Sequence, residues 1–167
     1  MRCHRGRYRL RYYILCDWSA FPMVLRILLT FVASLTFSLL FGVPKKELIC
    51  CGLCGAIGWL IYELLSPGAS SNVMPIFSAS IAATTASRFF SFKRKNPITL
   101  YLIAGIIPLV PGVAIYYTMY NILTGNSVLA ASYGIDTVRT AGVISLGIVI
   151  VLALPYQIFK MDFRNKA

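Results

Sequence analysis

Long runs of apolar residues, separated by short polar segments, make up most of the chain after residue 23. An α-helix rises 1.5 Å per residue, so about 20 apolar residues match the roughly 30 Å hydrocarbon core of a bilayer. The pattern predicts an all-α integral membrane protein, a bundle of five transmembrane helices at residues 24–43, 48–65, 73–90, 97–123 and 138–159. The count falls to four if the least apolar run, 73–90, does not fully cross the membrane.

The third run is rich in small and hydroxyl-bearing residues. Ser80, Thr84 and Ser87 share one helical face, because residues three or four positions apart lie above one another. Such a face either packs against neighbouring helices through its hydroxyl groups or forms the wall of a path for a polar solute. The sequence leaves both interpretations open.

The fourth run contains an interruption, the sequence IIPLVPGVAIYY at residues 106–117. Pro108 and Pro111 lack a backbone N–H and their rings clash with the preceding turn, so the helix should kink or unwind here. In a membrane, unwound backbone is tolerated where other helices or water in a cavity satisfy its polar groups. The sequence therefore predicts a helix broken between Pro108 and Gly112, beside a lined cavity.

A broken helix of this kind also favours anion binding. The half-helix that begins at Gly112 presents unpaired N–H groups and the positive end of its dipole. We expect the backbone of residues 110–113 to face a carboxylate of a small solute, with nearby hydroxyl groups as hydrogen-bonding neighbours. The predicted substrate path consists of Pro108, Val110, Pro111, Gly112, Ser80, Thr84 and Tyr116. The alternative is a structural kink that only fits the bundle.

Small residues in two other runs predict close helix contacts, since small side chains let helix backbones approach one another in membranes. These positions are Gly52, Gly55 and Gly58 in the second run and Gly142, Ser145 and Gly147 in the last. Residues 121–136 are predicted to form a loop or partly re-entrant connection, because Gly125 and Gly134 disfavour helix.

Composition agrees with a membrane protein, since the 167 residues are 58% apolar and only 13% charged, with a mean hydropathy of +0.75. The net charge of +11 does not indicate nucleic-acid binding, because the basic residues flank the apolar runs as membrane anchors do. No disulfide, metal or cofactor is expected. Cys51 and Cys54 form a bare C-x-x-C without a second ligand pair, and the single histidine, His4, is distant in sequence.

Glu63 is the only acidic residue well inside an apolar run. Its position near the end of that run favours a hydrated carboxylate at the membrane interface, and the alternative is a buried proton-coupling or substrate-binding group. The predicted spans contain no His, no Asp and no paired carboxylates. The acid–base groups that an enzyme needs are therefore missing from the spans, and we expect no enzymatic activity.

Three regions are predicted: a basic leader at 1–23, a single transmembrane domain at 24–160 and a short basic cytoplasmic tail at 161–167. The leader is interpreted as a basic tail or as sequence upstream of a true start at Met23, with the second interpretation favoured. An outside N-terminus puts most Lys and Arg residues after the leader on the cytoplasmic side, as the positive-inside tendency requires. These are Lys45, Lys46, Arg88, Lys93, Arg94, Lys95, Lys160, Arg164 and Lys166, against Arg26 and Arg139 outside.

Four sequences, taken in order, resemble the C-terminal half of the threonine/serine exporter family. They are LLFGVPKKEL (39–48), GAIGWLIYELL (55–65), the basic segment before Pro97 and IIPLVPGVAIYYTM (106–119). In some members this half is a separate small subunit, as in the two-component succinate exporter. The resemblance covers residues 24–160 and does not extend to the leader.

This resemblance implies secondary export of small amino acids or dicarboxylates through two five-helix halves in a bacterial cell membrane. The chain looks like one half, so a companion membrane subunit is implied, besides the lipid bilayer and a small carboxylate-bearing solute. The alternative function is a structural or regulatory membrane subunit that does not contact solute.

Overall fold

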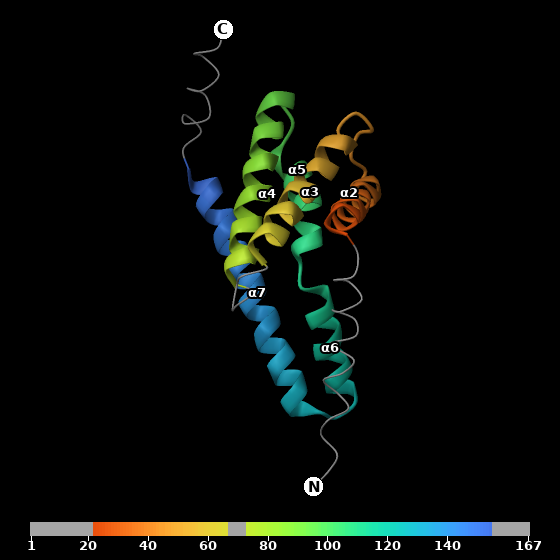
Figure 1. The fold of residues 1–167 in the computed structure, drawn as a ribbon, viewed down its shortest axis with the longest axis vertical. Coiled ribbons are helices and arrows are strands. Elements are labelled where there is room, and N and C mark those ends of the chain that lie inside the picture. Colours follow the sequence, from red (N-terminus) through yellow and green to blue (C-terminus); the bar gives the residue numbers. More distant parts are fainter. Residues whose placement is uncertain (1–21, 67–72, 155–167) are drawn as a thin grey trace.

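Six α-helices and a short 3-10 helix make up the described part of this computed structural model, residues 22–66 and 73–154. The α-helices are α2 (Met23–Leu40), α3 (Leu48–Leu65), α4 (Val73–Arg94), α5 (Ile98–Ile106), α6 (Gly112–Leu123) and α7 (Ser127–Ala153), and the 3-10 helix is η2 (Ile107–Leu109) (Figure 1). These ranges contain no strand, which agrees with the predicted all-α fold. The predicted leader and basic tail fall almost entirely outside the described residues.

Three helices, α2, α3 and α7, are long and apolar enough to cross a membrane. The pair Ile98–Leu109 and Gly112–Leu123, bent by 59°, makes a fourth candidate if it is counted as one span. The prediction of five spans is therefore supported only in part. The missing member is α4, whose 22 residues are numerous enough to cross but are not sufficiently apolar.

The polar helix α4 packs against three neighbours, α3, α5 and α7. Three of its hydroxyl groups are buried and donate to carbonyl oxygens of the same helix: Ser80 to Phe77 at 2.7 Å, Thr84 to Ser80 at 2.7 Å and Ser87 to Ala83 at 2.8 Å. A buried hydroxyl group that is hydrogen-bonded in this way avoids most of the desolvation cost. Protein surroundings thus allow a helix of low hydropathy to occupy the centre of the bundle.

Glycines give α3 its close contacts, as predicted. A Cβ atom at Gly55 would lie 2.0 Å from the Ser34 hydroxyl oxygen of α2, and one at Gly58 would lie 3.1 Å from the Ala83 Cβ of α4. In α7, Gly147 packs in the same way against Ser80, but a Cβ at Gly142 would meet nothing within 4 Å. The predicted packing role of Gly142 is therefore wrong.

The prediction of a loop at residues 121–136 is also wrong, because α6 continues to Leu123 and α7 already begins at Ser127. Only a tight turn joins them, in which Gly125 has a φ of +76°, a conformation that favours glycine. Gly134 lies inside α7, since one glycine costs a helix only about 1 kcal/mol and packing against α6 offsets this. The two helices form a hairpin whose lower part extends beyond the other helices (Figure 1).

Candidate functional site

The fourth predicted span is interrupted at the expected segment. Helix α5 ends at Ile106, η2 follows, and Val110 is extended with a ψ of 134° before α6 begins at Gly112. Two backbone hydrogen bonds between residues close in sequence hold the break. The Val110 N–H donates to the Ile107 carbonyl (3.2 Å), and the Gly112 N–H donates to the Val110 carbonyl (2.8 Å). Pro111 has no N–H to continue the helix, which explains why the chain turns here.

The first part of the break is packed into the bundle. The side chains of Pro108 and Leu109 each come within 3.6 Å of the Cβ positions of Gly55 and Gly58, respectively. Leu109 is buried in a cluster with Ala79, Ala83 and Ile144. The glycine face of α3 therefore makes room for the proline-containing segment, and the bend has a fixed position in the fold.

The second part of the break borders a cavity of about 250 Å³ that it shares with α7 and that is open at the surface of the chain. Val110 and Pro111 form one wall, and the other residues are Ala141, Ile144, Ser145, Ile148 and Val149. Among the described residues of this lining, Ser145 supplies the only side-chain hydroxyl group. In the sequence Ser145 looks like a small packing position. Its spacing of four from Ala141 puts both residues on one face of α7, but only the fold shows that this face lies opposite the break.

The N-terminus of α6 lies next to this cavity wall and is open. Among the described residues, the backbone amides of Val113 and Ala114 have no hydrogen-bond partner in the chain, as expected in a first helical turn. A Cβ at Gly112 would meet nothing within 4 Å. Free amides at the positive end of a helix dipole can bind an anionic group such as a carboxylate.

The remaining predicted path residues are not part of the cavity lining. Ser80 and Thr84 are fully buried, and their hydroxyl groups are bonded within α4. Tyr116 is 62% exposed on α6, where its ring stacks on Tyr120 with centroids 6.3 Å apart. Of the predicted path residues, only Val110 and Pro111 line the cavity. Pro108 packs into the bundle, Gly112 begins α6 beside the cavity wall, and the three side chains lie elsewhere.

Glu63 has a specific partner at the end of α3. Nη1 of Arg26, near the start of α2, donates to both carboxylate oxygens at 3.0 Å, and the two side chains are only 15% and 14% exposed. This largely buried ion pair differs from the hydrated carboxylate at the membrane interface that the position of Glu63 in the sequence favours. In the sequence Arg26 looks like a basic residue of the outer flank, and no local pattern pairs it with a residue 37 positions away.

A second carboxylate, that of Glu47, is buried, and the sequence did not predict this. Glu47, which precedes α3, is buried and accepts a hydrogen bond from the fully buried Tyr101 hydroxyl at 2.7 Å. Asn96 donates to that hydroxyl oxygen at 3.2 Å, and the Arg94 Nε lies 3.8 Å from Glu47. In the sequence Glu47 follows two lysines and resembles an ordinary turn residue, so its burial had no local signal.

No group of three or more His, Cys, Asp or Glu side chains that could hold a metal occurs within residues 22–66 and 73–154. Residues 26–154 match the family model described as Threonine/Serine exporter, ThrE. No curated protein and no solved structure matches the chain.

Proposed function

Because this chain belongs to the threonine/serine exporter family, we propose that it is one subunit of a secondary transporter that exports small amino acids or dicarboxylates. Family membership and the apolar helices support transport across a membrane rather than catalysis. The observation that carries the proposal is the broken helix α5–η2–α6, which lies within the matched residues and borders a cavity.

In this proposal a carboxylate of the solute binds at the start of α6. The free amides of Val113 and Ala114 and the helix dipole attract the anion, since the described residues that line the cavity include no Lys or Arg. The Ser145 hydroxyl is placed to bond a second polar group of the solute. A cavity of about 250 Å³ is smaller than the roughly 300–1,000 Å³ of drug-sized sites, which suits a small solute.

A companion membrane subunit completes the path. Among the described elements, α6 makes most of its contacts with α7, and it exposes large side chains such as Val113 (67%), Tyr116 (62%) and Met119 (60%). We place the companion's helical half against this face, in a bacterial cell membrane with the N-terminus outside and the C-terminus in the cytoplasm. Pairing with Arg26 favours a structural role for Glu63 over proton coupling, so the coupling group belongs to the companion in this scheme.

The test is Gly112→Ala, with Gly142→Ala as its matched control. Both added methyl groups meet open space, so both variants should reach normal abundance in the membrane with the companion present. Efflux of labelled threonine, serine and succinate should fall several-fold in Gly112→Ala alone, because only that methyl group narrows the approach to the free amides. Normal efflux at normal abundance would overturn the substrate site.

A structural or regulatory subunit is the second candidate, and it is favoured because the hydroxyl groups of Ser80 and Thr84 donate within α4 and do not line the cavity. Efflux is then measured with and without this chain while the companion's abundance is held constant. An unchanged efflux rate without this chain would support the structural role, and loss of efflux would support direct participation in transport.

A further inference from the structure

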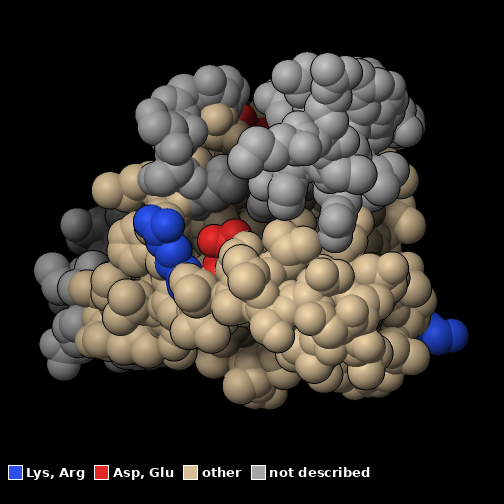
Figure 2. Space-filling view, turned by 90° about the horizontal axis from the view of Figure 1, so that it is seen from below, with Lys and Arg blue, Asp and Glu red and all other residues tan. Residues whose placement is uncertain are grey.

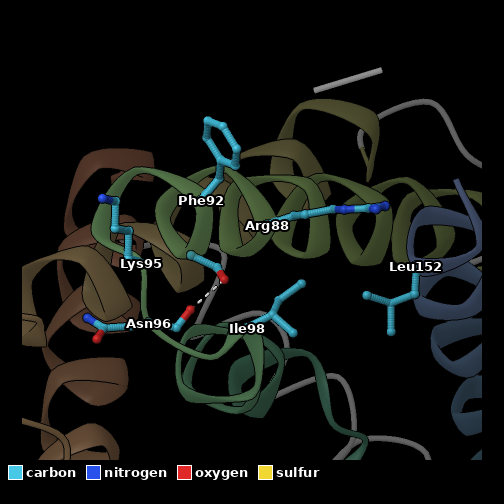
Figure 3. A pocket seen from close by; sticks show the side chains of 7 residues that line it. Arg88, Phe92, Lys95, Asn96, Ile98 and Leu152 are labelled. Carbon is cyan, nitrogen blue, oxygen red and sulfur yellow. Dashed lines mark hydrogen bonds between the residues drawn. The ribbon is translucent and has the colours of Figure 1, made fainter. Parts of the chain in front are cut away.

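Helix α7 turns one side toward the rest of the chain. Its Gly147 packs against Ser80 of α4, and its earlier turns pack against α6. Near its end, Arg88 of α4 extends toward α7 and donates to the carbonyl oxygens of Val151 and, at 2.7 Å, of Leu154 (Figure 3). These contacts fix the rotation of α7 about its axis, and they therefore define which of its residues face outward.

One outward row of α7 has the spacing of a helix-packing seam. Its members follow one another in alternating steps of four and three residues, a seven-residue repeat that keeps them along one side of a helix. Five of the six are exposed, and Val143 is half-buried. We call this row the α7 seam: Ser132, Asp136, Arg139, Val143, Leu146 and Ile150.

Two opposite charges occupy the α7 seam. Asp136 and Arg139 are exposed, and within the described part of the chain neither takes part in an ion pair or a side-chain hydrogen bond. Glu47 and Glu63, the other acids that the structure describes, each have an arginine partner. The end of the molecule seen from below shows few charged side chains among its described residues (Figure 2). An acid and a base are thus unpaired, three residues apart, on one exposed row.

Lipid alone suits this surface poorly. Helix α7 is one of the candidate spans, and charged side chains in such helices are costly to expose to lipid and usually pair or face protein. Leu146 and Ile150 continue the same row with apolar side chains that are 60% and 49% exposed, which suits contact with another helix. The α7 seam therefore fits a helix that supplies both an acid and a base.

We propose that the α7 seam pairs with the same seam of a second copy of this chain. In a parallel pair of helices related by a two-fold axis, Asp136 of each copy faces Arg139 of the other, so one surface supplies both ion pairs. The charges thereby fix the register of the two helices. The self-complementary order of the charges selects a second copy, because any other partner would need its own acid and base in matching positions.

This contact is separate from the proposed substrate site. The α7 seam shares no residue with the lining of the cavity beside the break, and it lies on a different helix from the α6 face assigned to the companion. The inference rests on the membrane location of the chain and does not depend on the solute or on the companion.

Charge reversal provides variants that test one another. Copies of Asp136→Arg carry two positive charges in the seam and copies of Arg139→Asp carry two negative charges, so each should self-associate about tenfold more weakly than the parent. An equimolar mixture restores opposite charges across the contact and should pair about as well as the parent. Both positions are exposed, so each copy should keep its fold, which circular dichroism checks.

Two further variants complete the set. The neutral double variant Asp136→Asn with Arg139→Gln removes the ion pairs without adding repulsion, and it should self-associate about fivefold more weakly than the parent. Lys45→Glu reverses an exposed charge in the turn between α2 and α3, outside the seam, and is the matched control.

The measurement is native mass spectrometry of the full-length chain in detergent, with two tags of different mass that distinguish mixed dimers from like dimers. The parent and Lys45→Glu should form dimers, the single reversals should be mostly monomeric at the same concentration, and their mixture should form mixed dimers. A monomeric parent, an unchanged dimer in the neutral variant or in either reversal, or a mixture that does not recover would overturn the proposal. Pairing through Asp136 and Arg139 with the companion alone would also overturn it, because the partner would then be a different protein.

Discussion

Gly147 in α7 is the position where one added methyl group should disturb the bundle most clearly. An ideal Cβ there would lie 1.9 Å from the Ser80 hydroxyl oxygen, 3.1 Å from the Ser80 Cβ and 3.4 Å from the Phe77 carbonyl oxygen. Rotating the hydroxyl away would break its 2.7 Å bond to Phe77, at a cost of about 1 kcal/mol. The Cβ–Cβ contact would remain, so α4 and α7 must also separate slightly, and such overpacking costs about 1–3 kcal/mol.

Alanine is favoured over glycine in a helix by about 1 kcal/mol, which offsets part of this loss. We therefore expect Gly147→Ala to lower the free energy of unfolding by about 1–3 kcal/mol. Gly142→Ala, five residues earlier in the same helix, meets open space and should leave stability unchanged or slightly higher. The measurement is unfolding of the purified full-length chain in detergent, followed by circular dichroism.

Ser80→Gly provides the rescue, because it removes the two Ser80 atoms that the new methyl group would meet and leaves only the Phe77 carbonyl oxygen at 3.4 Å. In a double-mutant cycle the pair Ser80→Gly and Gly147→Ala should show a favourable coupling of about 1–2 kcal/mol. Equal stability of Gly147→Ala and Gly142→Ala would refute the close α4–α7 contact, and so would additive effects in the cycle.

Three further outcomes are expected. Glu63→Gln should lower the free energy of unfolding by about 1–3 kcal/mol, because it weakens the hydrogen bond from a largely buried Arg26. The exchange of Arg26→Glu with Glu63→Arg should recover part of the lost stability, and no recovery would argue against the ion pair. Tyr101→Phe should lower the free energy of unfolding by about 1.5–3 kcal/mol, and by markedly less in a Glu47→Gln background, where the carboxylate is absent. An equal loss of stability in both backgrounds would contradict the hydrogen bond. The fully buried Cys54 thiol should react with N-ethylmaleimide only after the chain unfolds, and peptide mass mapping would measure this reaction. Modification of Cys54 in the folded chain would mean that this part of the bundle opens.

The features that the sequence predicted well depend on local chemistry. Pro108 and Pro111 interrupt a helix whatever surrounds them, so the break could be placed to within a residue or two. The triplet of glycines in α3 was likewise informative, because its spacing alone puts the glycines toward one side. Gly134 misled, since its small helix penalty was outweighed by packing against α6, a contact with no local signal.

The features that the sequence did not reveal depend on which helices meet. Gly142 and Gly147 look equivalent in the sequence, yet only Gly147 faces α4. The Arg26–Glu63 pair joins residues 37 positions apart, and Glu47 meets Tyr101 across 54 positions. The cavity beside the break could be expected from the prolines, but its second wall, with Ser145, comes from a different helix.

The interrupted helix also affects how this chain enters the membrane during synthesis. With 9 residues in α5 and 12 in α6, the two pieces measure only about 14 Å and 18 Å, and neither alone crosses the hydrocarbon core. The preceding α4 is not apolar enough to count as a span by itself. Between α3 and α7 only the bent pair formed by α5, η2 and α6, taken as one span, is long and apolar enough to cross, so we expect α4 and this pair to be inserted together rather than helix by helix.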